Sequence, residues 1–76
     1  MTQTDFINEL AAVLSEPTDK LVPGAKLESF EGWDSTAVLG VIAILEGSVG
    51  VQVEPEQVAG CKRIQDLIDL AQGKLS

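Results

Sequence analysis

The sequence predicts an all-α domain: a small four-helix bundle of three main helices and one short helix, with a long first loop. Apolar residues recur at helical spacing in separate stretches, and Pro and Gly residues lie between these stretches. No stretch alternates apolar and polar residues for long enough to indicate a strand. With 76 residues, 45% of them hydrophobic, the chain can bury one small core, so we expect a single domain over residues 1–76.

The first helix is expected to begin at Thr2 or Thr4, either of which can cap it, and to run to about Leu14. Its apolar residues at helical spacing are Phe6, Ile7, Leu10, Ala11, Val13 and Leu14. Pro17 ends it, and residues 15–33 show no sustained period. Because so long a loop is unusual in a small domain, we expect it to be packed. The apolar residues available to hold it are Leu21, Val22, Leu27 and Phe30.

The second helix is expected to start at Ser35, because the Asp34 side chain can cap a helix that begins directly behind it. Its apolar stripe consists of Val38, Val41, Ile42, Leu45 and Val49, and Leu39, Ala43 and Ile44 extend it nearly all round. Gly47 and Gly50 end it. Such a helix is central to a bundle or offers an apolar patch to a partner.

Pro55 is suited to the first turn of a short helical piece over residues 56–59, which Gly60 closes. The last helix is expected from about Arg63 to Lys74. Its inward-facing residues are Ile64, Leu67, Ile68, Ala71 and Leu75.

The composition excludes several classes of function. The net charge of −7 argues against nucleic acids and anionic membranes and favours basic surfaces on protein partners. The chain has no His and no Tyr, which removes the usual general base and the usual catalytic triads, and a lone Cys cannot build an ordinary zinc site. We therefore expect neither an enzyme nor a metal site. One Cys without a partner, no apolar segment of bilayer length and no basic N-terminal region together favour a cytoplasmic protein.

Ser35 is the candidate functional residue. At the first position of a helix its hydroxyl lies at the positive end of the helix dipole, where free N–H groups favour an anion. A phosphate attached to this hydroxyl would be stabilised there and held clear of the core. The alternative from these residues alone is an ordinary serine at a helix start.

Several stretches together resemble the acyl carrier protein family. They are Gly32-Trp33-Asp34-Ser35, the apolar helix through Leu45-Glu46, the closing segment Ile64-Gln65-Asp66-Leu67-Ile68-Asp69-Leu70 and the loop Leu21-Val22-Pro23-Gly24-Ala25-Lys26-Leu27. The resemblance implies that a phosphopantetheinyl transferase, using coenzyme A and Mg²⁺, attaches 4′-phosphopantetheine to Ser35, with Asp34 helping the transferase hold its metal. The arm would carry acyl groups as thioesters between acyl-loading and acyl-transferring enzymes of fatty-acid, polyketide or related biosynthesis, and the carrier itself would be a monomer without catalytic activity.

The resemblance also implies two sets of binding residues. The face of the second helix that partner enzymes read would comprise Thr36, Leu39, Gly40, Ala43 and Glu46. A pocket for the acyl chain would be lined by Leu45, Val53, Val58, Cys61 and Leu67. Apart from that role, Cys61 is expected to be a small buried apolar residue and not a reactive thiol. Trp33 is expected to pack as a lid on the loop.

The chain departs from the family pattern in the second helix. Thr36 replaces the usual Leu, and Ala37, Gly40 and Gly47 stand where fatty-acid carriers place acidic residues, so we expect packing to matter more than charge and a specialised carrier. Lys62-Arg63 stands where the family often has Thr, and we expect the last helix to fray at its start. An aminoacyl or peptidyl carrier remains an alternative, as does a helical interaction module that binds a partner with Ser35 unmodified.

Overall fold

The computed structural model describes residues 1–75 and confirms a small all-α bundle. Its elements are α1 (Gln3–Leu14), η1 (Thr18–Lys20), η2 (Leu27–Ser29), α2 (Ser35–Ala43), η3 (Ile44–Val49), α3 (Pro55–Ala59) and α4 (Ile64–Leu70). Here η1 and η2 are 3₁₀ turns, and η3 is a π-helical turn that continues α2. Residues 1–75 contain no strand, only an isolated antiparallel bridge between Lys26 and Arg63.

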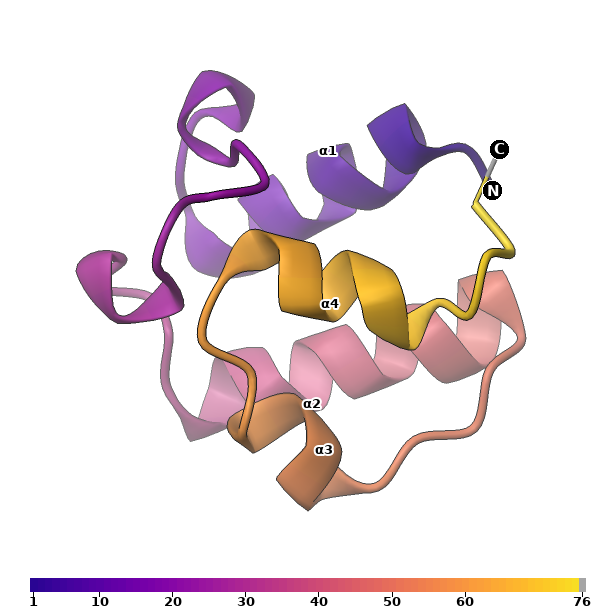
Figure 1. Ribbon diagram of the computed structural model, residues 1–76. Coiled ribbons are helices and arrows are strands. Elements are labelled where there is room, and N and C mark those ends of the chain that lie inside the picture. Colours follow the sequence, from indigo (N-terminus) through magenta and orange to yellow (C-terminus); the bar gives the residue numbers. More distant parts are fainter. Residues whose placement is uncertain (76) are drawn as a thin grey trace.

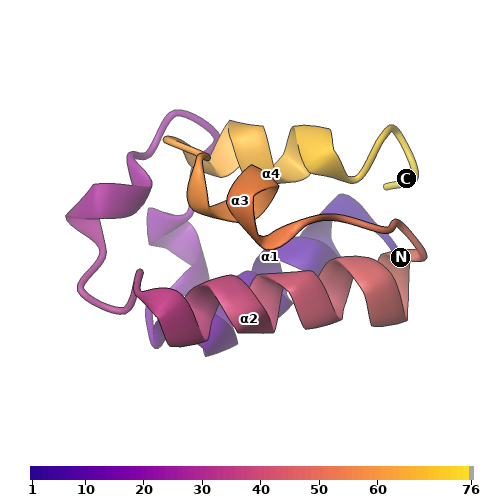
Figure 2. The same cartoon turned by 90° about the horizontal axis from the view of Figure 1, so that it is seen from below.

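Figures 1 and 2 show α1, α2 and α4 lying roughly alongside one another, while the short α3 lies between α2 and α4 on one side. The long loop between α1 and α2 fills the end of the bundle at which α2 begins. The N-terminus and the last described residues lie together at the opposite end. The start of α2, which carries Ser35, therefore lies next to the loop, α3 and the segment that leads into α4.

The core is entirely apolar in the described chain. Its buried residues are Phe6, Leu10, Ala11, Leu14, Leu21, Leu27, Phe30, Ala37, Val41, Ile44, Leu45, Val51, Val53, Val58, Ile64, Leu67 and Ala71. Every α-helix contributes to this set, and so does the loop, so the elements share one core and none folds against the others as a separate unit.

The start of α1 and the packing of the loop agree with expectation, apart from one residue. Thr2 caps α1 by accepting a hydrogen bond from the Asp5 N–H, with Oγ1 3.0 Å from the nitrogen. Leu21, Leu27 and Phe30 are buried as predicted, but Val22 is 54% exposed, so its expected role in holding the loop is wrong. The loop touches the core with one face only, and Val22 lies on the other.

Helix α2 begins at Ser35 as predicted, but its buried stripe is rotated. The buried residues are Ala37, Val41, Ile44 and Leu45, whereas Val38, Ile42 and Val49 are only partly buried. After Ala43 the α-helix continues as the π-helical turn η3. Because the turns of a π-helix are wider than those of an α-helix, the side chains of η3 point in other directions than an unbroken α-helix would give them. Gly50 ends this turn with φ of +88°, a conformation that favours glycine.

The prediction for α3 is confirmed. Pro55 occupies its first turn and Gly60 follows its last residue. The segment before it, residues 51–54, is extended without forming a strand.

Helix α4 starts next to Arg63 as predicted, but its predicted end and the expected fraying of its start are wrong. The helix stops at Leu70, not at Lys74, because Gln72 and Gly73 both adopt left-handed conformations, with φ of +57° and +74°. Its start does not fray. The Asp66 carboxylate accepts hydrogen bonds from the N–H groups of Lys62 and Arg63, at 2.8 and 3.0 Å. The next two N–H groups donate to loop carbonyls, Ile64 to Ala25 and Gln65 to Pro23.

Candidate functional site

Asp34 and Ser35 form the start of α2. The Asp34 backbone is extended, and its carboxylate accepts a hydrogen bond from the Ala37 N–H at 2.9 Å. The Asp34 carbonyl accepts from the Val38 N–H at 3.0 Å. Among the described residues, the N–H groups of Ser35 and Thr36 have no acceptor, and both side chains are exposed. The start of α2 therefore presents a free hydroxyl beside two free donors.

Gly32 allows the turn before Asp34 to approach the end of α1. A Cβ atom built on Gly32 would lie 2.4 Å from the Leu14 carbonyl oxygen, closer than any real contact. Only a glycine fits at this position without moving the backbone. This contact fixes where the turn, and therefore Ser35, leaves the bundle.

An apolar groove of about 540 Å³ opens beside Ser35. Val38 and Leu39 of α2 form one wall, and Pro55, Glu56 and Ala59 of α3 form the other. Trp33 closes one end of the groove next to Asp34 and Ser35. Leu39 is 64% exposed, so the groove presents apolar surface directly to solvent.

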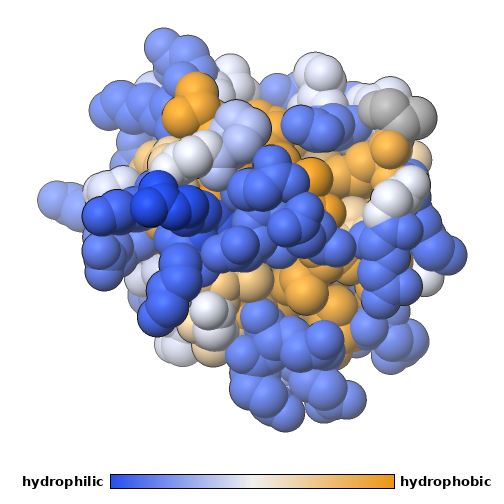
Figure 3. All heavy atoms as spheres, viewed as in Figure 1, coloured by the Kyte–Doolittle hydropathy of each residue, from blue (hydrophilic) through white to orange (hydrophobic). Residues whose placement is uncertain are grey.

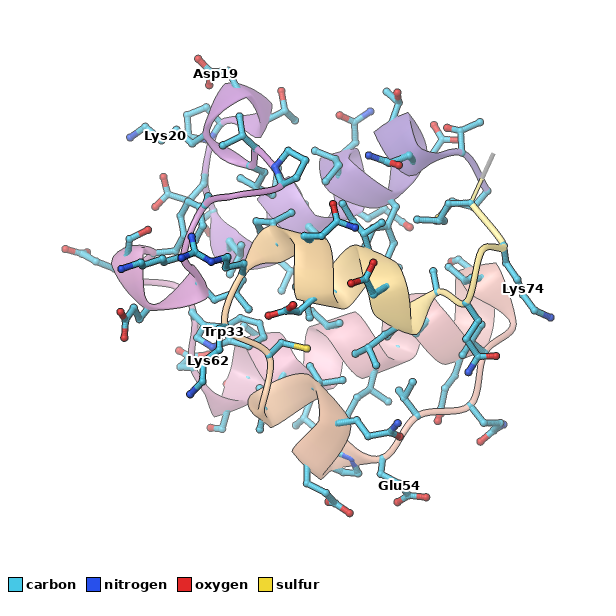
Figure 4. The ribbon with its side chains drawn as sticks, in the orientation of Figure 1. Asp19, Lys20, Trp33, Glu54, Lys62 and Lys74 are labelled. Atoms are coloured by element: carbon cyan, nitrogen blue, oxygen red, sulfur yellow. The ribbon has the colours of Figure 1, made fainter. Side chains whose placement is uncertain are left out.

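A second hollow, of about 400 Å³, lies on the other side of Trp33 and differs in character. Its lining comprises Lys26, Glu28, Trp33, Ala59, Cys61, Lys62 and Arg63. Trp33 and Ala59 belong to both hollows, so the two adjoin. Figure 4 shows Trp33 and Lys62 close together near the start of α2, and Figure 3 shows hydrophilic atoms gathered over this edge of the molecule.

Backbone pairing brings the basic residues of the second hollow together. Lys26 and Arg63 are opposite each other in the antiparallel bridge, and the Leu27 N–H donates to the Lys62 carbonyl at 2.8 Å. Arg63 is also held through its side chain, whose Nη1 donates to the Gly24 carbonyl at 2.7 Å. The loop before α2 and the segment before α4 thus form one wall.

Two titratable groups near the second hollow have shifted pKa values. The pKa of the Cys61 thiol is raised, chiefly because it is partly buried and also because Asp66 and Asp69 are negative. Cys61 is half-buried, and its Sγ donates to the Gln57 carbonyl. The pKa of Asp66 is lowered because the N–H groups of Lys62 and Arg63 donate to its carboxylate.

The residues predicted to contact partner enzymes lie mostly on the outer face of α2 and η3. Thr36, Leu39, Ala43 and Glu46 are exposed. Gly40 is only half-exposed, since it faces α1, where an added Cβ would lie 3.0 Å from a methyl group of Val13. The Glu46 carboxylate is 3.4 Å from the Val53 N–H, a long hydrogen bond back to the protein.

The residues predicted to line an acyl pocket lie mostly in the closed core. Leu45, Val53, Val58 and Leu67 are buried, while Cys61 lines the second hollow instead. Their role in holding an acyl chain stays a prediction. Sequence reasoning did not single out Lys26, Lys62 and Arg63 as a cluster, because Lys26 is far in the chain from the neighbours Lys62 and Arg63 and only the backbone bridge brings it to them.

Within residues 1–75, no three His, Cys, Asp or Glu side chains cluster in a way that could hold a metal ion. No helix in that range combines the length and the apolar character that crossing a membrane requires.

Comparison with known proteins shows similarity to a distant relative. An acyl carrier protein of Thermosynechococcus vestitus (strain NIES-2133 / IAM M-273 / BP-1) is 28% identical over 80 aligned residues, which cover 100% of this chain and 99% of the relative. No family model matches the chain, and no solved structure matches it significantly. The similarity extends over the full length and suggests an acyl-carrier-like protein without assigning a pathway.

Proposed function

We propose that the protein is an acyl carrier that bears 4′-phosphopantetheine on Ser35. The observation that supports this most is an exposed hydroxyl at the start of α2, beside free N–H groups and an open apolar groove. The distant carrier relative, aligned over its whole length, supports the same assignment. In this proposal the protein carries intermediates of fatty-acid, polyketide or related biosynthesis between cytoplasmic enzymes, and catalyses nothing itself.

The residues around Ser35 fit a 4′-phosphopantetheine group. A phosphodiester on the Ser35 oxygen would lie next to the unpartnered N–H groups of Ser35 and Thr36, at the positive end of the α2 dipole. The arm would leave the protein at the mouth of the groove, whose apolar walls can contact its carbon chain. When bound, the group supplies a thiol that forms a thioester with the acyl cargo.

Attachment would be catalysed by a phosphopantetheinyl transferase. The Ser35 oxygen attacks the phosphorus of coenzyme A that bears the pantetheine, the bond to the second phosphate breaks, and 3′,5′-ADP leaves. The serine proton passes to a base of the transferase. Asp34 lies next to the hydroxyl and is exposed, so its carboxylate is available to help hold the transferase's Mg²⁺.

The test is the mass of the intact protein after incubation with coenzyme A, Mg²⁺ and a broad-specificity phosphopantetheinyl transferase. We expect a gain of one phosphopantetheine on the wild type and none on Ser35→Ala. Ser48→Ala is a matched control that removes another exposed serine hydroxyl, leaves Ser35 in place and should still be modified. A gain on Ser35→Ala would place the attachment elsewhere, and no gain on any protein would contradict the carrier assignment.

A second function has one observation in its favour. Leu39 is a large apolar side chain that is mostly exposed on α2, as expected of a surface that binds another protein. A helical interaction module would bind its partner through this face with Ser35 unmodified. Binding of a partner that survives Ser35→Ala but is lost in Leu39→Ser would favour this function over the carrier.

A further inference from the structure

The second hollow concentrates positive charge in a strongly acidic chain. Three of the five Lys and Arg residues, Lys26, Lys62 and Arg63, line it, although the protein carries a net charge of −7. Glu28 is the one acidic residue of its lining. The lining of the hollow therefore carries three positive charges and one negative charge, with the carboxylates of Asp66 and Asp69 near Cys61, and its basic side chains attract anions.

None of these basic side chains forms an ion pair in the described chain, although the charge of Arg63 contributes to lowering the pKa of Asp66. Within residues 1–75 the single ion pair joins Lys20 and Glu16, so none of the three basic side chains contacts a carboxylate. Asp66 lies nearby, but its carboxylate accepts from the backbone N–H groups of Lys62 and Arg63. Arg63 donates to the Gly24 carbonyl, which positions the guanidinium without neutralising it.

The pairing of Lys26 with Arg63 is unfavourable without an anion. Residues directly opposite each other across an antiparallel bridge have neighbouring side chains, and like charges at such positions destabilise the pairing. A carboxylate held between them would remove this repulsion and form charge-assisted hydrogen bonds. The backbone thus holds two cations side by side at a hollow large enough for a small ligand.

The hollow adjoins the groove at Ser35. Both share Trp33 and Ala59, so a chain that leaves Ser35 along the apolar walls reaches the cationic hollow on the far side of Trp33. A phosphopantetheine arm fits this succession when the acyl group on its thiol ends in an anion. An acidic surface of a partner enzyme would match the charge, but it would make no use of the apolar groove.

We propose that the second hollow binds the free carboxylate of an acyl group carried on Ser35, so that the cargo is a dicarboxylic acid attached through one carboxyl. This inference rests on the proposed function. The carboxylate lies among Lys26, Lys62 and Arg63, while the methylene chain contacts Trp33. The interaction is electrostatic and weakens as the ionic strength rises.

The experiment compares two acylated phosphopantetheine arms that differ only in whether the acyl group ends in a carboxylate or in a methyl group. The transferase loads Ser35 from glutaryl-coenzyme A or from pentanoyl-coenzyme A, and intact mass confirms that each protein is fully loaded. ¹H–¹⁵N spectra then report the amides of Lys26 and Lys62 and the indole of Trp33. We expect the glutaryl arm to shift all three signals relative to the pentanoyl arm and to raise the melting temperature. Added salt should diminish both differences.

Lys26→Gln and Lys62→Gln are expected to lose the difference between the two arms. Lys74→Gln removes the same charge at the other end of the molecule, as Figure 4 shows, and should keep the difference. If neither arm loads, the proposed function fails and the inference with it. If both arms load and give the same spectra and melting temperatures, the carrier assignment stands and the carboxylate site is refuted. Equal losses in Lys62→Gln and Lys74→Gln would also refute the site, since overall charge would then explain the effect.

Discussion

Asp34 is expected to have two roles. Its hydrogen bond stabilises the start of α2, and its negative charge assists the modification of Ser35. Two substitutions separate these roles. Asp34→Ala removes the acceptor that lies 2.9 Å from the Ala37 N–H. Loss of such a cap costs about 1 kcal/mol of the free energy of unfolding. For a domain of this size, about 1 kcal/mol lowers the melting temperature by roughly 4–8 °C. Asp34→Asn keeps an acceptor of the same shape, and because Asn caps helices about as well as Asp, we expect only about 0.3 kcal/mol of loss.

Urea unfolding of the wild type, Asp34→Ala and Asp34→Asn measures these differences in the free energy of unfolding. The comparison requires that the slope of this free energy against urea concentration is the same in all three proteins. Equal destabilisation by Asp34→Ala and Asp34→Asn would refute the reasoning, because the negative charge at the helix start, and not the hydrogen bond, would then stabilise α2. The rate of loading by the transferase is measured on the same samples. We expect Asp34→Asn to fold like the wild type and to be loaded more slowly, since it lacks the carboxylate available to the metal.

Three further predictions follow from single contacts. Gly32→Ala should cost about 1–3 kcal/mol in urea unfolding, because its Cβ would collide with the Leu14 carbonyl, whereas Gly24→Ala, whose Cβ meets nothing within 4 Å, should change little. The pKa of Asp66 is lowered in the folded protein, so its ionised carboxylate stabilises the folded state at pH values above the ordinary pKa of Asp. This stabilisation is lost as the pH falls through the lowered pKa. The stability difference between the wild type and Asp66→Asn should therefore shrink in acid titrations, and a constant difference would contradict this. Cys61, whose pKa is raised, should be alkylated more slowly near pH 8 in the folded protein than in urea, as mass spectrometry would show.

The starts of the helices could be predicted because the signals are local. Thr2, Asp34 and Pro55 each act within their own first turn, so a reading of neighbouring residues is sufficient. Ser35 was found in the same way, as the residue that follows a cap. Its exposure and its free N–H neighbours follow from that position.

What could not be predicted depends on contacts between distant segments or on a single backbone dihedral angle. The end of α4 is set by the left-handed conformation of Gln72, a residue that rarely adopts it. The start of α4 is stabilised by loop carbonyls that no local pattern identifies. The cationic hollow likewise requires Lys26 to pair with Arg63 across the fold. Val22 has the same apolar character as Leu21, and only the path of the loop decides which of the two is buried.

The π-helical turn at the end of α2 bears on how the chain tolerates a change in length. In η3 each hydrogen bond spans one residue more than in an α-helix, as between the Gly50 N–H and the Leu45 carbonyl, 2.8 Å apart. Removing one residue here would let the turn close as an ordinary α-helix, leaving α3 and α4 in place. The same deletion within Ser35–Ala43 would rotate Ser35 by about 100° about the helix axis and away from its groove. Length variation in this fold is therefore expected at the end of α2 that is far from Ser35.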